Sequence, residues 1–173
     1  MSSLNRLLRT RRLALRPVVQ DDLNVLLSLR NEPRVLAGSA TGAELPAEQM
    51  ARQLQRWLTL WRVRDVGTWM VELDGAIVGF VVLDPIGDGY TGVDPDALEI
   101  GVVVHPDHWG TGIAGEAGFA VATDCFTRAG LPHLYATVDQ RNAQSLAVIE
   151  KVNGARRIDT KEGEDLYVLA AEA

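Results

Sequence analysis

The stretch that decides the fold runs from Ala97 to Gly118 and reads Ala-Leu-Glu-Ile-Gly-Val-Val-Val-His-Pro-Asp-His-Trp-Gly-Thr-Gly-Ile-Ala-Gly-Glu-Ala-Gly. Its first part, Leu98 to Val104, is rich in β-branched residues and ends before a proline, which predicts a buried strand. The glycines within residues 107–112 favour a turn. From Ile113 on, small apolar residues recur at helical spacing. The stretch therefore predicts a strand, a glycine turn and a helix in that order.

This order of elements creates a site for an anion. The first turn of a helix has backbone N–H groups without helical partners, and the helix dipole adds partial positive charge at the same end. A glycine turn leading into that end leaves its own N–H groups accessible as well, an arrangement suited to a phosphate. We interpret residues 110–115 as such an anion cradle.

The same residues spell a dinucleotide fingerprint, G-x-G-x-x-G from Gly110 to Gly115, and Asp139 follows a second predicted strand. Three observations count against that interpretation. Five residues, His105 to Trp109, separate the strand from the first glycine, whereas the dinucleotide turn is tight. The motif also lies late in the chain, and a hairpin precedes it instead of strand–helix–strand units. A Walker-type phosphate loop is excluded, because the chain has no G-K-[ST] sequence.

The bulk properties predict one α/β domain over residues 1–173. The chain is 47% hydrophobic and 23% charged, which is ordinary for a soluble domain with a full core. A net charge of −6 argues against a nucleic-acid partner and is compatible with a cationic substrate. The single cysteine, Cys125, excludes an internal disulfide and is expected in the core. No apolar run reaches membrane-spanning length and the start is not a signal sequence, so we expect a cytoplasmic protein without a membrane partner.

The remaining patterns predict a mixed sheet with helices on both faces. Upstream, Asp74-Gly75 between two apolar runs is a strong hairpin signal. Downstream, strands alternate with helices, and Gly154 is expected to end the last helix. The predicted elements are a strand within residues 9–18, a helix over 21–30, a loop over 31–45, a helix from 46, hairpin strands 69–73 and 76–83, a strand 134–138, a helix 142–151, and strands 155–160 and 166–170 around a polar turn.

Two charged segments have alternative interpretations. Five arginines between residues 6 and 16 either contact a ligand phosphate or form a solvated face. Four aspartates in the loop 84–96, with Glu99 after it, either attract an ammonium substrate or form a solvated acidic loop.

Three motifs of the chain match patterns of a known protein family. Trp109-Gly110-Thr111-Gly112-Ile113-Ala114 fits Q/R-x-x-G-x-G/A, with tryptophan in the first place. A second motif, N-x-x-S…E-K, is matched by Asn142-Ala143-Gln144-Ser145 together with Val148-Ile149-Glu150-Lys151-Val152. The segment from Thr10 to Pro17 matches the first strand of the same family. Together these motifs resemble the GCN5-related N-acetyltransferase (GNAT) superfamily, in particular its RimJ/RimL-type branch, which acetylates ribosomal-protein N-termini. Val152-Asn153-Gly154-Ala155 departs from the branch pattern by an extra residue and a missing aromatic, where the resemblance implies the start of the next strand and a wall of the acceptor pocket.

The resemblance implies a single GNAT-like domain with a mostly antiparallel mixed sheet and acetyl-coenzyme A as co-substrate. The residues it implies in cofactor binding are Val102, Val103, Val104, Trp109, Gly110, Thr111, Gly112, Ile113, Ala114, Gly115, Asn142 and Ser145. Glu99 matches a general base acting through water, and Ser145 a proton donor to the departing thiolate. A strand N–H near Val103 or Val104 would polarise the thioester carbonyl.

Alternatives to these roles remain open from the sequence. Glu99 could be only a charge at a strand entrance, and Ser145 a hydroxyl bonded to its own helix. His105 and His108 are alternative bases or exposed turn residues, and no spacing supports a metal site.

The function expected from all this is acetyl transfer from acetyl-coenzyme A to a primary amine, at a protein N-terminus or on a small molecule, by direct attack on the thioester. The alternative from another functional class is a non-catalytic module that binds acyl-coenzyme A. A dinucleotide-binding domain is the less favoured third alternative. A homodimer is expected only because the resemblance to this family implies one.

Overall fold

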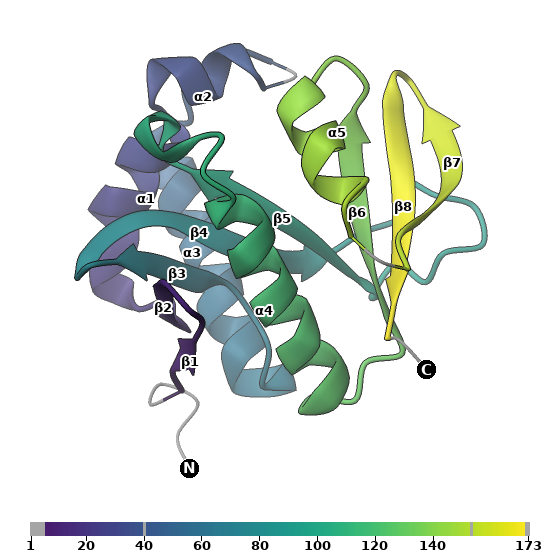
Figure 1. The fold of residues 1–173 in the computed structure, drawn as a ribbon, viewed down its shortest axis with the longest axis horizontal. Helices are drawn as coiled ribbons and strands as arrows, with labels where there is room; N and C mark the ends of the chain where they lie inside the picture. The colour runs from purple at the N-terminus through teal and green to yellow at the C-terminus, as the bar shows by residue number, and fades with distance from the viewer. Residues whose placement is uncertain (1–5, 40, 153, 172–173) are drawn as a thin grey trace.

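The computed structural model describes residues 6–39, 41–152 and 154–171. They form an eight-stranded sheet in the order β1-β2-β3-β4-β5-β6-β8-β7, in which every neighbouring pair is antiparallel except β5 and β6 (Figure 1). The predicted mixed, mostly antiparallel sheet is confirmed. The strands are β1 (Leu8–Arg9), β2 (Leu13–Pro17), β3 (Trp69–Leu73), β4 (Ala76–Pro85), β5 (Leu98–Val104), β6 (His133–Asp139), β7 (Arg156–Lys161) and β8 (Glu164–Ala170).

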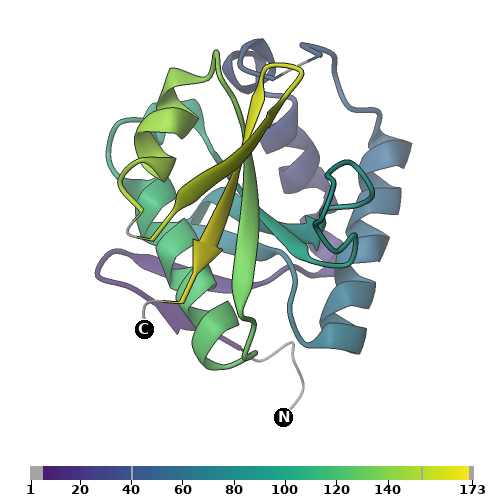
Figure 2. The same cartoon turned by 90° about the vertical axis from the view of Figure 1, so that its right-hand side faces the viewer.

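Helices cover both faces of this sheet, as predicted. The helices α1 (Leu23–Arg30) and α3 (Ala47–Arg64) pack together on one face, and α4 (Ile113–Thr127) and α5 (Ala143–Ile149) lie on the other (Figures 1 and 2). The apolar residues of α3 recur on one side of the helix, and this side is buried against the sheet. Its buried side chains are Met50, Leu54, Trp57 and Trp61.

Small residues let α4 lie close to the central strand. A Cβ added to Gly118 would come within 3.3 Å of Val102 Cγ2, so the helix approaches β5 more closely than a larger residue would allow. Cys125, on the same helix, is fully buried, and burial raises the pKa of its thiol to about 12. The cysteine is therefore a core residue, as expected, and holds no reactive thiolate.

The sheet opens between its two parallel strands. Along β5 and β6 only one position is paired, Glu99 with Tyr135, and beyond it the strands diverge (Figure 1). This gap separates β1–β5 from β6–β8. A doubly wound dinucleotide fold is built from parallel strands, so this sheet excludes that alternative.

The structure corrects the sequence-based elements in four places. The predicted loop 31–45 contains a short helix, α2 (Pro33–Ala37), and β1 precedes the predicted first strand. The helix α5 ends at Ile149 and continues only as turns, and β7 and β8 extend so far into the predicted polar turn that only two residues, Glu162 and Gly163, connect them. Asn153, the predicted insertion, lies outside the described residues. Among the described helices, none is long and apolar enough to cross a membrane.

Candidate functional site

The loop between β5 and α4 has the backbone conformation of an anion cradle. Gly110 and Gly112 adopt φ angles of 75° and 82°, a region that glycine enters at low cost. Gly112 is the N-cap of α4 and supplies no side-chain cap. Within the described chain, the backbone N–H groups of residues 110–115 donate to no protein acceptor. These amides are therefore available to bind an anion.

Side chains of the preceding turn hold this loop in place. The indole Nε1 of Trp109 donates to the carbonyl oxygen of Val104 at 2.8 Å, and Thr111 Oγ1 donates to His108 O at 2.6 Å. His105 Nδ1 accepts from the backbone N–H of Asp107 at 3.3 Å, so this imidazole caps the turn. His105 and His108 thus both belong to the turn before the cradle. In the part of the chain that the structure describes, no group of three or more potential ligands could hold a metal ion.

The diverging strands place backbone donors between the cradle and the point where β5 and β6 meet. The N–H of His105 donates to Val78 O on β4. Because backbone groups alternate between the two edges of a strand, the amides of Val104 and Val102 face the opposite edge, toward β6. No β6 residue is paired with either of them. Of the two oxyanion donors expected from the sequence, Val103 or Val104, the alternation favours Val104, and it adds Val102.

Glu99 lies where the two strands meet, at the closed end of this gap. Its Oε1 accepts from the backbone N–H of Thr137 on β6 at 3.2 Å, so the side chain reaches across the gap. Burial raises the pKa of Glu99, because desolvation outweighs the hydrogen bonds from Thr137, and the nearby carboxylates of Glu164 and Asp84 add to the rise.

Asp84 is the cross-strand partner of Glu99 on β4 and lies on the same face of the sheet. Trp57 of α3 holds it there, since its indole Nε1 donates to Asp84 Oδ2 at 3.0 Å. A second carboxylate is thereby fixed beside Glu99. The sequence analysis placed Asp84 in an acidic loop, whereas the structure places it in β4. Its contact with Trp57, 27 residues away in the chain, could not be predicted from the local sequence pattern.

Asn142 and Ser145 come together at the start of α5. Asn142 caps the helix, and its Oδ1 accepts from the backbone N–H of Ser145 at 3.0 Å. Only the amide nitrogen of Asn142 remains to donate to a ligand. The hydroxyl of Ser145 is half-buried and makes no protein hydrogen bond within the described residues. Because β5 and β6 run parallel, the starts of α4 and α5 lie at the same end of the sheet (Figure 1).

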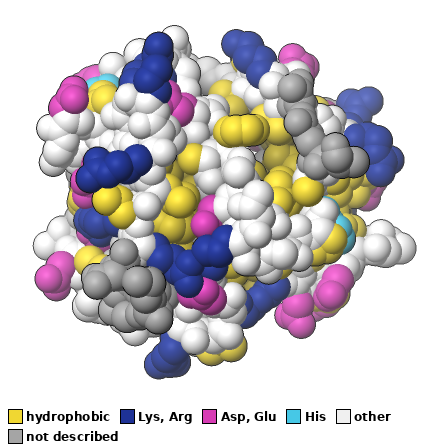
Figure 3. Space-filling view, turned by 60° about the horizontal axis from the view of Figure 1, so that its bottom comes forward, with side chains coloured by type: hydrophobic (Ala, Val, Ile, Leu, Met, Phe, Trp, Pro, Cys, Tyr) yellow, Lys and Arg dark blue, Asp and Glu magenta, His cyan; other side chains and the backbone are white. Residues whose placement is uncertain are grey.

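Most of the N-terminal basic cluster is occupied by ion pairs. Arg6 pairs with Asp65, Arg16 with Asp22 and Glu72, and Arg12 with Glu116 in the first turn of α4. Arg9 and Arg11 are exposed. They border a groove of about 450 Å³ between the β1–β2 hairpin and α4, where Phe119 is 68% exposed. Figure 3 shows hydrophobic side chains reaching the surface between Lys and Arg side chains on one face.

The short helix α2 also contacts the turn that connects β5 to residues 110–115. Its Arg34 donates to Asp107 at 2.9 Å, and Glu32, the residue before Pro33, caps the helix through the N–H groups of Arg34 and Val35. Proline at the first helical position is a helix-start signal, so the start of this element was detectable in the sequence.

Comparison with known proteins assigns the family. The family model "Acetyltransferase (GNAT) domain" matches residues 12–154, most of the chain. The chain therefore belongs to the GNAT acetyltransferase family. This confirms the predicted family, the N-acetyltransferase class and acetyl-coenzyme A as co-substrate.

Solved structures agree with this fold. An acetyltransferase from Agrobacterium tumefaciens is 24% identical with a TM-score of 0.78, over 96% of this chain and 95% of that one. A GNAT-family acetyltransferase from Bacillus anthracis is 21% identical with a TM-score of 0.71, over 95% and 98%. RimL, a ribosomal L7/L12 alpha-N-protein acetyltransferase solved with coenzyme A, is 15% identical with a TM-score of 0.70, over 95% and 98%. Ribosomal-protein acetyltransferases are thus among the structural neighbours.

Proposed function

We propose that the chain, as one catalytic domain, transfers the acetyl group of acetyl-coenzyme A to a primary amine held at the gap between β5 and β6. The observation that carries this proposal is the joint placement of three features. Among the described residues, cradle amides without a protein acceptor lie at the open end of the gap, strand amides without a partner line it, and the half-buried carboxylate of Glu99 closes it.

The residues present fit coenzyme A. The amides of residues 110–115 and the positive end of α4 suit its pyrophosphate. A Cβ at Gly110 or Gly115 would meet nothing within 4 Å, so the described part of the chain does not fill the space beside these glycines. The pantetheine arm would follow Val102 to Val104 along the open edge of β5, with the Asn142 amide as a further donor. When bound, the co-substrate supplies an activated acetyl thioester, and RimL, solved with coenzyme A, has the same fold.

Glu99 is proposed as the general base. The attacking amine must lose a proton to form the C–N bond, and Glu99, at the closed end of the gap, takes that proton through a water molecule. Burial raises the pKa of Glu99, which brings it closer to the pKa of the amine from which Glu99 must take the proton. The N–H groups of Val102 and Val104 would stabilise the negative charge that forms on the carbonyl oxygen.

Ser145 is proposed as the donor that protonates the departing thiolate as the C–S bond breaks. Its hydroxyl has no competing protein acceptor in the described chain, and the Asn142 cap fixes the first turn of α5 on which it lies. The alternative, a hydroxyl bonded to its own helix backbone, has no such bond to support it among the described residues.

The acceptor is proposed to be a cationic amine, either a protein N-terminus or a small molecule. Asp84 and Glu164 each lie near Glu99, so the proposed base lies in a region of negative charge that attracts an ammonium group. The test is release of thiol from acetyl-coenzyme A in the presence of a panel of amines and N-terminal peptides. Turnover with an amine that is lost in Glu99→Gln supports the proposal. Binding of acetyl-coenzyme A without turnover on any acceptor would indicate a non-catalytic binding module.

A further inference from the structure

One arginine outside the family's cofactor motif contacts the cradle directly. Arg12 precedes β2, about a hundred residues before the cradle, yet its Nη1 donates to the carbonyl oxygen of Thr111 at 2.9 Å. The rest of its guanidinium is bound to Glu116, with Nε to Oε2 at 2.8 Å and Nη2 to Oε2 at 2.7 Å. The guanidinium therefore bridges the cradle and the first turn of α4.

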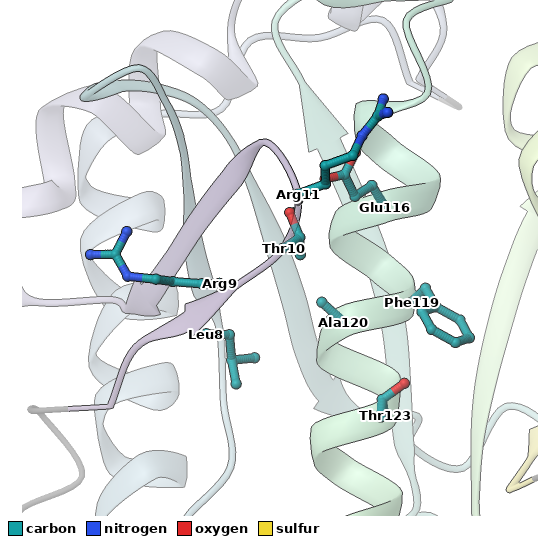
Figure 4. Close-up of a pocket in the computed structure, with 8 residues that line it drawn as sticks. All are labelled: Leu8, Arg9, Thr10, Arg11, Glu116, Phe119, Ala120 and Thr123. Atoms are coloured by element: carbon teal, nitrogen blue, oxygen red, sulfur yellow. Dashed lines mark hydrogen bonds between the residues drawn. The ribbon is translucent and has the colours of Figure 1, made fainter.

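Glu116 is itself fixed by the hairpin on which Arg12 lies. Its Oε1 accepts from Thr10 Oγ1 at 2.5 Å and from the backbone N–H of Arg12 at 3.1 Å. Figure 4 shows Thr10 on the hairpin and Glu116 on the facing helix. Desolvation opposes ionisation of Glu116, but the hydrogen bonds from Thr10 and Arg12 outweigh it and hold its pKa below the ordinary value. The guanidinium is thus held between a fixed carboxylate and the loop.

The contact with Thr111 sets the direction of a cradle amide. In a trans peptide the C=O of one residue and the N–H of the next point in opposite directions, and the described chain has no cis peptide. A Thr111 carbonyl turned toward Arg12 therefore turns the N–H of Gly112 away from Arg12, and among the described residues this N–H has no protein acceptor. With glycine on both sides of Thr111, the backbone torsions alone restrict this peptide little, so the hydrogen bonds of Thr111 to Arg12 and to His108 set its orientation.

The same bridge removes an electrostatic conflict. A carboxylate in the first turn of α4 stabilises the helix but repels a phosphate at its N-terminus. Arg12 neutralises Glu116, so the pair adds no net negative charge beside the loop. Without it, the cradle would have an unpaired negative charge one helical turn from the anion that it binds.

We propose that Arg12 is a positioning residue for the coenzyme A pyrophosphate, acting through the Thr111–Gly112 peptide with Glu116 as its anchor. This inference rests on the proposed function, because it presumes that the cradle binds coenzyme A. Its effect is confined to the pyrophosphate end of the ligand.

The test compares Arg12→Gln and Arg12→Lys with Arg9→Gln by calorimetric titration with coenzyme A. Arg9 is exposed on the same hairpin, and Figure 4 shows its side chain directed away from α4, so its replacement removes the same charge without touching the loop. Arg12→Lys keeps a cation beside Glu116 but cannot donate to both partners in the same geometry, and it carries the test if Arg12→Gln does not fold. Both Arg12 variants are expected to raise Kd roughly tenfold, equivalent to about 1.4 kcal/mol, with Arg9→Gln near wild type.

Phosphorus NMR of bound coenzyme A separates positioning from general damage. The pyrophosphate resonances of the complex are expected to differ between wild type and Arg12→Lys, whereas the resonance of the 3′-phosphate, on the same ligand, stays unchanged. Equal affinities for the Arg12 and Arg9 variants, or equal changes at all three phosphorus atoms, would overturn the inference. Failure of the wild type to bind coenzyme A would instead overturn the proposed function.

Discussion

The carboxylate of Glu99 accepts a hydrogen bond from the backbone N–H of Thr137 at 3.2 Å, across two parallel strands that are paired at only one position. This contact closes the gap between β5 and β6 with an ionisable group. Burial at this position raises the pKa of the carboxylate, although the hydrogen bond from Thr137 by itself favours the ionised form. The proposed base therefore lies at the point where β5 and β6 begin to diverge, at the closed end of the gap proposed to hold the co-substrate.

Replacing Glu99 with Gln is expected to lower kcat by roughly 10²-fold or more while the affinity for coenzyme A is kept, because general bases contribute about 10²–10⁴-fold. In the wild type, activity should fall as the pH drops through the raised pKa of Glu99, and this acid limb should disappear in the variant. The measurement is a pH–rate profile with one amine acceptor. An unchanged acid limb in Glu99→Gln would assign the base to another group.

Stability should respond to Glu99 in the opposite sense from a salt-bridged carboxylate. The folded state binds this proton more tightly than the unfolded state, so the contribution is present at low pH and is lost as the pH rises through the folded pKa. Glu99→Gln should therefore gain stability relative to wild type at neutral pH and less at pH 4. Denaturant unfolding at both pH values checks this, and a larger gain at pH 4 would contradict it.

Replacing Asp84 with Asn removes a like charge from the face that Glu99 occupies and keeps an acceptor for Trp57 Nε1. The pKa of Glu99 should fall, and the acid limb of the pH–rate profile should move to lower pH. Asp88→Asn, an exposed change in the adjoining loop, serves as the control of equal charge. A limb that moves equally in both variants would indicate a general effect of net charge.

Replacing Ser145 with Ala should lower kcat about tenfold or more without weakening coenzyme A binding, because the thiolate loses its proton donor. The loss should shrink with a thioester whose thiol is more acidic, since that leaving group needs less protonation. Gln144→Ala, at the exposed neighbouring position, is the control. Equal losses with both thioesters would argue that Ser145 acts only in packing.

Replacing Gly112 with Ala should affect both stability and cofactor binding. A φ of 82° costs a side-chain-bearing residue about 1–2 kcal/mol, and relaxation of the backbone would turn cradle amides away from the ligand. Gly75→Ala, at φ 81° in the β3–β4 turn, has a similar strain far from the cradle. Both variants should lose stability, but only Gly112→Ala should lose coenzyme A affinity. Equal affinity in the two would show that the cradle does not hold the ligand.

The local elements of this fold were largely predictable from the sequence because their signals are local. The limits of β5, Leu98–Val104, and the start of α4 at Ile113 match the structure, since β-branched residues and then small apolar residues mark them. Asp74 and Gly75 both adopt positive φ, as the hairpin signal implied. The helix α2 was missed because five residues are too few to show a helical period, although Glu32 before Pro33 marks its start.

The site was less predictable, because its contacts join distant parts of the chain. Motif spacing indicated the proposed cradle and the Asn142–Ser145 turn, but no periodicity links Arg12 to Thr111 or Trp57 to Asp84. The sequence left the basic cluster open between a ligand contact and a solvated face. The structure shows a third outcome for three of its members, which are paired with carboxylates of the protein itself.

Binding of coenzyme A at the cradle is the central claim, and thermal unfolding with acetyl-coenzyme A, coenzyme A and NAD in parallel tests it most directly. A ligand at about 100 times its Kd stabilises the folded state by roughly 2.7 kcal/mol, or about 5–10 °C in Tm for a domain of this size. We predict such a shift with both coenzyme A species and none with NAD. A shift with NAD alone, or no shift with any of the three, would contradict the claim.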